Sequence, residues 1–188
     1  MMAPLNTAVS QAAQPQIDAL AAVIPVIETE RLILRAPRLS EWPVLEPIWT
    51  TERGKYIGGP MSAEDGWLDF NHLVASWVLR GYGALTITSK ADSSVLGVVL
   101  LEHEMGDPEP ELGWLLTEAA EGHGYAYEAA TAMVPLGLEL FGDGGFVSYV
   151  HQDNDRSIRL AERLGASVDA ERHPAFPEGL IFRHGRPQ

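Results

Sequence analysis

The sequence predicts an α+β fold: a single domain built on one central mixed, mostly antiparallel and twisted sheet of about seven strands flanked by helices. Two observations support this prediction. Strand-like and helical segments follow one another irregularly, as one strand, two helices, three strands, a helix, a strand, a helix and two final strands. The chain also has 188 residues, of which 46% are hydrophobic and 21% charged, so it can bury a complete core as one domain.

The N-terminal segment differs from the rest in composition. Residues 1–24 mix Ala, Gln and Pro without sustained periodicity, which predicts a loosely attached or partly helical extension ahead of a domain spanning residues 25–188. This extension could also form a contact in a homodimer. No basic residue precedes an apolar run at the start, and the apolar stretch 19–27 is short and interrupted by Pro25. We therefore expect neither a signal peptide nor a membrane span, and a cytoplasmic location.

The first part of the domain is predicted to contain one strand and two helices. Ser40 can cap a helix that has Pro43 in its first turn. Ser62 and Asp65 approximate a capping box at the start of a longer, amphipathic helix. The predicted elements are strand 29–35, helix 40–49, loop 51–60 and helix 62–79.

The second part contains the remaining strands and two further helices. Pro135 lies inside the longer helix, where it removes a backbone hydrogen bond, so we expect a bend at residues 131–135. The predicted elements are hairpin strands 85–88 and 95–101, strand 111–116, a helix from Gly124 to Phe141, strand 146–150, helix 155–164 and strands 168–172 and 180–183.

A loop with two glycines joins the strand 111–116 to the helix that follows Gly124. The loop reads Glu121, Gly122, His123, Gly124. A strand, a glycine-containing loop and a helix start leave several backbone N–H groups without partners at one point, where the helix dipole also favours negative charge. The sequence therefore predicts a binding site for an anion such as a phosphate.

Two common phosphate-binding motifs do not fit this loop. A dinucleotide fingerprint needs a third glycine, but Tyr125, Ala126 and Tyr127 follow Gly124. A nucleoside-triphosphate loop needs Gly-Lys-Ser/Thr, which does not occur in the chain.

The loop resembles the coenzyme A pyrophosphate loop of the GNAT superfamily of acyltransferases, written Gln/Arg-x-x-Gly-x-Gly/Ala. Gly124 and Ala126 match that pattern, and Glu121 departs from it. A second segment, which starts at Asn154 and ends at Gly165, resembles the other signature of the superfamily: an Asn that opens a helix ending in Gly before the next strand.

The N-terminal part of the domain is similar to one branch of this superfamily. Residues 28–35 resemble the first strand of the RimJ/RimL-like acetyltransferases, which are related to those that modify ribosomal-protein N-termini. The resemblance covers residues 28–183 and implies a GNAT-like domain. It also implies acetyl-coenzyme A as co-substrate and the following cofactor-binding residues: Trp114, Leu115 and Leu116 for the pantetheine arm, Glu121, Gly122, His123, Gly124, Tyr125 and Ala126 for the pyrophosphate, and Asn154 for the pantetheine.

Acetyl transfer to an amine requires a base and a proton donor for the departing sulfur. Glu111 opens the central strand, and the resemblance implies that an acidic residue there acts as base, directly or through a water. Many GNAT enzymes use a Tyr as the proton donor, but that position is Ala161, so Ser157 is the expected replacement. Residues close to Glu111 that could substitute for it are Glu109, Glu104 and His103.

The acceptor side is less defined by the sequence. We expect the loop 56–60 to line the acceptor pocket, because in this fold the early helices cover that side. Positive potential for coenzyme A could come from Arg156, Arg159 and Arg163. Aromatic residues that could line the pocket, or belong to the core, are Trp67, Trp77, Tyr56 and Tyr82.

Charge and composition limit the possible partners. The net charge of −13 argues against nucleic-acid binding and mildly favours cationic substrates. The chain has no cysteine, so it can form neither a disulfide nor an acyl-cysteine intermediate, and its histidines lack paired metal-ligand spacing. We expect an N-acetyltransferase acting by direct transfer, with a small-molecule amine or a protein N-terminus as acceptor. A non-catalytic acyl-coenzyme A binding or sensing module is the alternative, and a longer acyl donor is also open.

Overall fold

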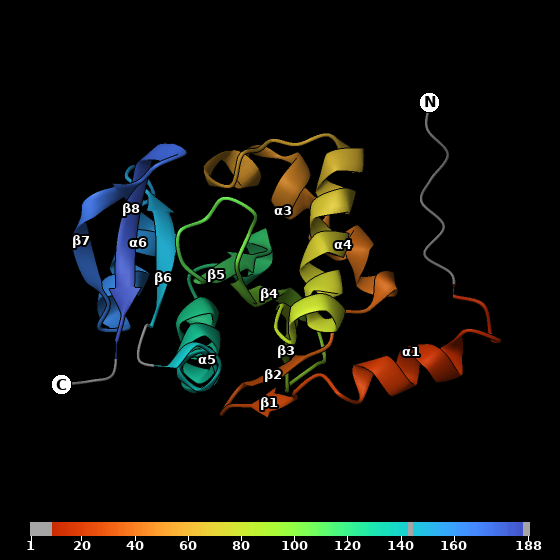
Figure 1. Ribbon diagram of the computed structural model, residues 1–188. Coiled ribbons are helices and arrows are strands. Elements are labelled where there is room, and N and C mark those ends of the chain that lie inside the picture. The colour runs from red at the N-terminus through yellow and green to blue at the C-terminus, as the bar shows by residue number, and fades with distance from the viewer. Residues whose placement is uncertain (1–8, 143–144, 186–188) are drawn as a thin grey trace.

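The computed structural model describes residues 9–142 and 145–185, which form one eight-stranded sheet flanked by helices (Figure 1). The strands lie in the order β1-β2-β3-β4-β5-β6-β8-β7, and every neighbouring pair is antiparallel except β5 and β6. The predicted mixed, mostly antiparallel sheet is therefore confirmed. The strands are β1 Ile27–Glu28, β2 Leu32–Arg35, β3 Ala84–Ser89, β4 Val95–Glu102, β5 Glu111–Leu116, β6 Phe146–His151, β7 Ser167–His173 and β8 Phe176–His184.

The sheet has one strand more than expected because a short strand, β1, precedes the first predicted strand, 29–35. Ile27 pairs with Leu34 and Glu28 with Ile33, so β1 and β2 form a narrow hairpin. Within it, the Thr29 N–H donates to the carbonyl of Leu32 at 3.0 Å. The predicted continuous strand 29–35 was wrong at its start, since a local turn satisfies these backbone groups.

The predicted helix 40–49 is also divided. A 3-10 turn, η1 (Leu39–Glu41), precedes two short helices, α2 (Trp42–Leu45) and α3 (Pro47–Thr50). Pro47 lacks an N–H and so cannot continue the hydrogen-bond ladder of α2. Ser40 lies inside the turn and is not the cap; the cap position is Arg38, whose N–H donates to the buried Glu41 carboxylate at 2.9 Å.

The remaining helices follow the prediction more closely. Helix α4 (Ala63–Arg80) is capped by Ser62, whose hydroxyl accepts the Asp65 N–H at 3.0 Å. Pro135 lies inside α5 as expected, and the bend there stays a prediction. The other helical elements are α1 Gln14–Ala21, η2 Glu52–Tyr56, η3 Glu118–Ala120, α5 Tyr125–Phe141 and α6 Asp155–Arg163. None of the helices in residues 9–142 and 145–185 has the length and apolar character needed to cross a membrane.

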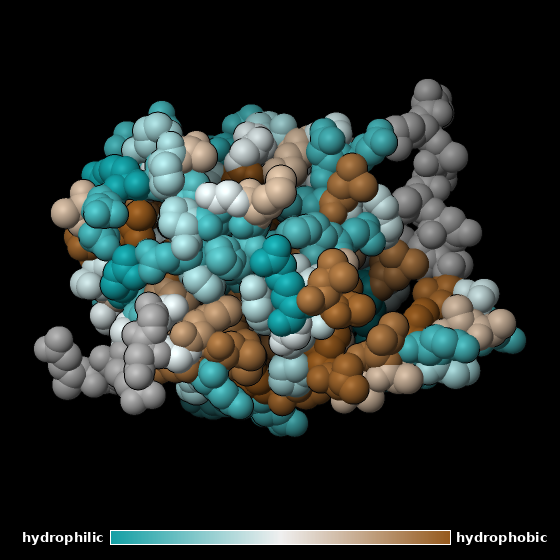
Figure 2. All heavy atoms as spheres, viewed as in Figure 1, coloured by the Kyte–Doolittle hydropathy of each residue, from teal (hydrophilic) through white to brown (hydrophobic). Residues whose placement is uncertain are grey.

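The N-terminal helix α1 is partly separate from the core. It has no buried residue, and it lies beside the β1 edge of the sheet in Figure 1. Exposed apolar side chains, including Leu20, Val23 and Val26, occur in and just after this helix. Apolar side chains also gather over this part of the molecule in Figure 2. A dimer contact here stays a prediction.

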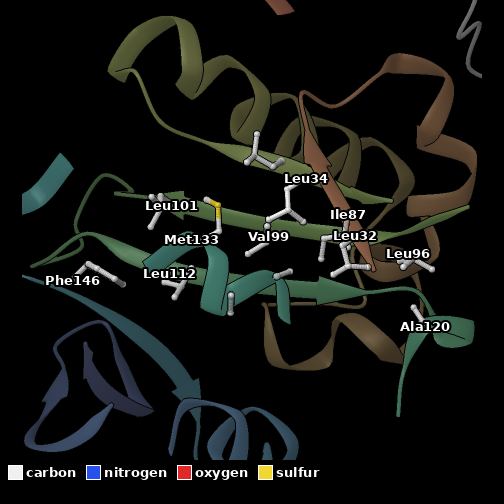
Figure 3. Packing of buried hydrophobic residues seen from close by; sticks show 13 residues of the cluster. Leu32, Leu34, Ile87, Leu96, Val99, Leu101, Leu112, Ala120, Met133 and Phe146 are labelled. Carbon is white, nitrogen blue, oxygen red and sulfur yellow. The ribbon is translucent and has the colours of Figure 1, made fainter. Parts of the chain in front are cut away.

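Two hydrophobic clusters cover opposite faces of the sheet. Helix α5 places Met133 against the strands, near Val99, Leu101 and Leu112 (Figure 3). The second cluster joins α2, α3 and α4 to the other face, with Trp42, Trp49 and Phe70 in mutual contact. These clusters pack both faces of β3, β4 and β5. β2 continues this sheet on one side, whereas β6 on the other side shares a single residue pair in register with β5 among the described residues.

Candidate active site

A large open cleft lies where β5 and β6 separate. The only residue pair in register between these two parallel strands, within the described part of the chain, is Glu111 with Val147. Beyond it the strands diverge, and the cleft has a volume of about 1760 Å³. Pockets for a single drug-sized ligand span roughly 300–1,000 Å³, so this cleft has room for a large ligand and a second molecule.

Along the exposed edge of β5, the main-chain N–H and C=O groups of alternate residues point toward the cleft. The carbonyl of Leu112 accepts from the Ser148 hydroxyl at 2.6 Å, and that of Leu116 accepts from Arg53 at 2.8 Å. Because main-chain groups alternate in direction along an antiparallel pair, those of Trp114 point the same way. Leu115 lines the cleft, but by the same alternation its main-chain groups point toward β4. Of the three residues predicted to hold the pantetheine arm, Trp114 and Leu116 therefore direct main-chain groups toward the cleft.

The glycine loop presents helix N–H groups to the cleft. Gly122 and Gly124 both have φ of +79°, a left-handed conformation that favours glycine. Gly124 occupies the N-cap position of α5 without a side-chain cap, and it lines the cleft with Tyr125 and Ala126. The first-turn N–H groups can therefore donate to an anion. His123 turns its carbonyl to Arg31, which donates to it at 3.0 Å.

Glu121 forms ion pairs with two arginines. One of its carboxylate oxygens contacts Arg53 from η2, and the other contacts Arg156 from α6. Glu121 replaces the Gln or Arg of the family pattern, and its negative charge is thus balanced by two arginines of the same protein. Arg53 was missed by sequence reasoning, because no motif connects η2 to a loop so distant along the chain.

The start of α6 brings together the predicted Asn154 and Ser157. Asn154 Oδ1 caps the helix by accepting the Ser157 N–H at 3.3 Å. The Ser157 hydroxyl accepts from the Trp114 indole Nε1 at 3.2 Å. Because Trp114 donates, the hydroxyl hydrogen of Ser157 remains available for a different acceptor. Arg159 and Arg163 line the same cleft, as expected.

Glu111 lies at the point of separation, opposite Glu102 on β4. Burial, followed by the negative charges of Asp107 and Glu104, raises the pKa of Glu111 to about 8. A carboxylate with a pKa near neutral pH can take a proton more effectively than an ordinary glutamate, so this environment suits a general base.

The neighbouring candidates for the base have different environments. Arg183 holds Glu109 through two hydrogen bonds of 2.5 and 2.8 Å, which lowers the pKa of that carboxyl. His103 Nε2 lies 3.0 Å from the Asp107 carbonyl. Glu104 lines the cleft together with Glu111.

The acceptor side is formed by η2 and the residues that follow it. Tyr56 lines the cleft with Ile57 and Gly58, and its hydroxyl donates to the Asp153 carbonyl at 2.9 Å, on the opposite side. The other aromatic candidates, Trp67, Trp77 and Tyr82, pack against the hydrophobic clusters. Within the described residues, no group of three or more His, Asp or Glu is placed to hold a metal ion.

Comparison with known proteins agrees with this geometry. A family model described as the acetyltransferase (GNAT) domain matches residues 31–167. The chain is similar to a solved acetyltransferase from Agrobacterium tumefaciens str. C58, with a TM-score of 0.80 and 37% identity over 87% of this chain and 95% of that chain.

Two more distant structures share the fold. RimL, the ribosomal L7/L12 alpha-N-protein acetyltransferase, in complex with coenzyme A, matches with a TM-score of 0.64 and 20% identity over 85% of this chain and 96% of its own. The microcin C7 self-immunity acetyltransferase in complex with acetyl-coenzyme A and AMP matches with a TM-score of 0.59 and 18% identity over 84% and 93%. At these identities the likeness concerns the fold alone.

Proposed function

The chain belongs to the acetyltransferase (GNAT) family and is an acetyl-coenzyme A dependent N-acetyltransferase, and from that premise we propose that it acetylates a primary amine by direct transfer in the cleft between β5 and β6. The observation that carries this proposal is the pairing of Glu111 with Val147, the one pair that joins β5 and β6 in the described part of the chain. Beyond it, one strand edge and one helix start line the same cleft.

The donor end of the cleft fits the diphosphate and the pantetheine arm of coenzyme A. The first-turn N–H groups after Gly124 would bind the diphosphate, with positive charge from the arginines of α6 close by. Trp114 and Leu116 would hold the pantetheine amides along the strand edge, as a neighbouring strand would. When bound, the thioester supplies the activated acetyl group.

The chemistry requires one proton transfer and one hydrogen bond that this chain can make. Glu111 would take a proton from the amine nitrogen as that nitrogen attacks the acetyl carbonyl. The Ser157 hydroxyl would donate a hydrogen bond to the sulfur as the carbon–sulfur bond breaks, and the released thiolate would take its proton from solvent. Trp114 supports this role by holding the Ser157 oxygen as an acceptor at 3.2 Å. The chain lacks cysteine, so the acyl group has no cysteine thiolate to pass through.

The resemblance of residues 28–35 supports placing the chain in the RimJ/RimL-like branch. RimL itself acts on the N-terminus of ribosomal L7/L12, and its fold matches this chain. Branch membership alone leaves the acceptor open between a protein N-terminus and a small amine.

Titration calorimetry with coenzyme A and turnover of acetyl-coenzyme A with a panel of amines test the proposal together. We expect micromolar binding and release of free thiol with at least one amine. Binding without turnover on any acceptor would favour a sensing module, a reading to which the buried Ala161 in place of the usual Tyr lends some support. No binding at all would refute both.

A further inference from the structure

Ser148 lies on β6, next to the point where β5 and β6 separate, and its hydroxyl takes part in two hydrogen bonds. The residue is buried, with an exposed fraction of 1%. Its Oγ donates to the carbonyl of Leu112 on β5 at 2.6 Å and lies 2.9 Å from Nε2 of His184 on β8. In Figure 1, β8 lies on the side of β6 that faces away from β5. This one side chain therefore connects three strands at the start of the gap.

The two hydrogen bonds fix the state of the histidine. A serine hydroxyl has one hydrogen, and this one goes to Leu112, so Nε2 of His184 carries the hydrogen of the second contact. Burial lowers the pKa of His184 to about 4, and the ring stacks on Phe146 with centroids 5.0 Å apart. The imidazole is therefore neutral at pH 7 and donates to Ser148 from a fixed orientation.

The bond to Leu112 replaces a main-chain bond of the sheet. In a continuous parallel pair with the register seen here, the Leu112 carbonyl would accept from the main-chain N–H of Tyr149. The preceding bond of this series is present, since the Val147 N–H donates to the Pro110 carbonyl at 2.9 Å. At Leu112 the Ser148 hydroxyl takes the place of the next donor. A side chain thus satisfies the acceptor at the residue where the regular pairing ends.

The replacement leaves the Tyr149 N–H available to the candidate base. Burial raises the pKa of Glu111, and a hydrogen bond from the main chain of Tyr149 opposes that rise. Such a bond favours the ionised form of a carboxyl, which is the form that a base needs. The Tyr149 hydroxyl also accepts from the N–H of Glu109 at 3.2 Å and donates to its carbonyl at 3.3 Å. Tyr149 therefore holds both the carboxylate and the segment that leads into it.

We propose that Ser148 is a positioning residue that acts on the candidate base Glu111. By occupying the Leu112 carbonyl, its hydroxyl keeps the Tyr149 N–H on the Glu111 carboxylate. His184 completes the arrangement by holding the Ser148 oxygen. This inference rests on the proposed acetyltransferase function and adds a residue that acts through the base. Without the hydroxyl, the Tyr149 N–H would turn to Leu112, and the Glu111 carboxylate would lose a donor.

Ser148→Ala tests the proposal through the pH profile of kcat/KM, measured with acetyl-coenzyme A and the best amine of the panel. Loss of one donor should raise the pKa of Glu111, so the inflection near pH 8 should move up by about one pH unit. The ratio of wild-type to variant kcat/KM should then be about tenfold at pH 7 and close to one at pH 10. An equal loss at every pH, or an unchanged profile, would overturn the proposal.

The other titratable groups around Glu111 keep their places in Ser148→Ala, so a moved inflection reports on the lost donor. These groups are Glu102 on β4, Glu104 and Asp107 between β4 and β5, the Tyr149 phenol on β6, and His173 on β7, which contacts Asp107.

Thr88→Val is the matched control. Thr88 on β3 is also buried, and its hydroxyl donates across the sheet to the Ile33 carbonyl at 2.9 Å, but it does not line the cleft. Valine keeps the shape and removes the hydroxyl, so the inflection should stay near pH 8. If Thr88→Val moved the inflection as far as Ser148→Ala does, the effect would not be specific and the proposal would be wrong.

Two variants of His184 give a second test that leaves Ser148 in place, and they decide the question if Ser148→Ala does not fold. His184→Phe keeps a ring against Phe146 but removes the donor, so the inflection should move in the same direction by a smaller amount. His184→Gln keeps an N–H donor and should stay closer to the wild type. An inflection that moves equally in both variants, or in neither, would contradict the proposed role of this donor.

A double variant separates an effect through Glu111 from a general one. In Glu111→Gln the base is already absent, so adding Ser148→Ala should lower the residual kcat/KM by about twofold or less. A further tenfold loss would count against the proposal. Coenzyme A binding without turnover on any amine would refute the acetyltransferase function, whereas turnover with a wild-type pH profile in Ser148→Ala would refute this inference alone.

Discussion

The two ends of the cleft place glutamate side chains in opposite electrostatic environments. At the donor end, Glu121 is held between Arg53 and Arg156, so its charge is balanced inside the protein. At the acceptor end, Glu102 and Glu111 face each other across two strands without an arginine, and burial raises the pKa of each to about 8. The difference indicates that Glu121 joins parts of the protein, whereas the other two carboxyls can bind and release a proton near neutral pH.

The largest expected effect separates chemistry from cofactor binding. Glu111→Gln should lower kcat by roughly 100-fold to 10,000-fold, the usual contribution of a general base. Coenzyme A affinity should stay unchanged, because the diphosphate binds at the other end. Stopped-time thiol release and calorimetry measure the two quantities. Glu109→Gln is the matched control, since Arg183 already occupies that carboxylate; a fully active Glu111→Gln would remove it as base.

The pH dependence sharpens the same assignment. Glu111 must be ionised to accept a proton, so kcat/KM should rise as pH increases through about 8, its raised pKa. The groups facing it are all acidic or neutral at that pH: Glu102, Glu104, Asp107 and the Tyr149 phenol. The residual kcat/KM of Glu111→Gln should no longer show this increase near pH 8. A profile with an inflection near the ordinary glutamate pKa would contradict the account.

The donor end should respond to a change in backbone conformation. Gly124→Val forces a β-branched residue to a φ of +79°, so the helix start should distort and coenzyme A affinity should fall by about tenfold or more. Gly142 ends the same helix with a positive φ of +63°. Because its ψ is −149°, Gly142→Val carries at least as much strain as Gly124→Val, but away from the cleft, and it should retain coenzyme A affinity in calorimetry. Equal loss in both variants would show a general folding defect.

A smaller effect is expected from the balanced carboxylate. Glu121→Gln restores the family residue and frees Arg53 and Arg156 from their internal partner, so coenzyme A should bind about two- to tenfold more tightly at low salt. Glu118 lines the same end of the cleft, and none of the arginines in residues 9–142 and 145–185 forms an ion pair with it. Glu118→Gln therefore removes one charge without freeing an arginine. It should change the affinity less. Weaker binding in Glu121→Gln would mean that the ion pairs are needed to position the loop.

The smallest effect concerns stability at the acceptor end. Burial first, then the charges of neighbouring carboxylates, raises the pKa of Glu102 from 4.5 to about 8. The folded state therefore holds a proton that the unfolded state has lost, and the free energy of unfolding decreases as pH rises from about 4.5 to 8. Glu102→Gln should raise Tm by a few degrees at pH 8 and show little difference at pH 5. Thermal melts at both pH values measure this, and an equal Tm at pH 8 would show that Glu102 is not destabilising.

Local patterns in the sequence were sufficient for most of the fold. The strand Glu111–Leu116 and the helix Tyr125–Phe141 were predicted with their boundaries, because glycine and proline flank them and their apolar residues follow one period. The helix 40–49 was predicted as one element, because the break at Pro47 depends on how both short helices pack into the core.

Contacts between residues far apart in the sequence could not be predicted from local patterns. The partnership of Glu121 with Arg53 joins residues far apart in sequence, and so does the opposition of Glu102 and Glu111 across a hairpin register. The sequence indicated Glu111 and Ser157 through resemblance, but the Trp114 contact that orients Ser157 and the burial that raises the pKa of Glu102 required the packed structure.

A crystal structure of the protein with coenzyme A bound tests the central claim most directly. We predict the diphosphate on the N–H groups that follow Gly124, and the thiol end of coenzyme A close to Glu111 and Ser157. Coenzyme A bound outside the gap between β5 and β6, or a thiol distant from both residues, would contradict this account.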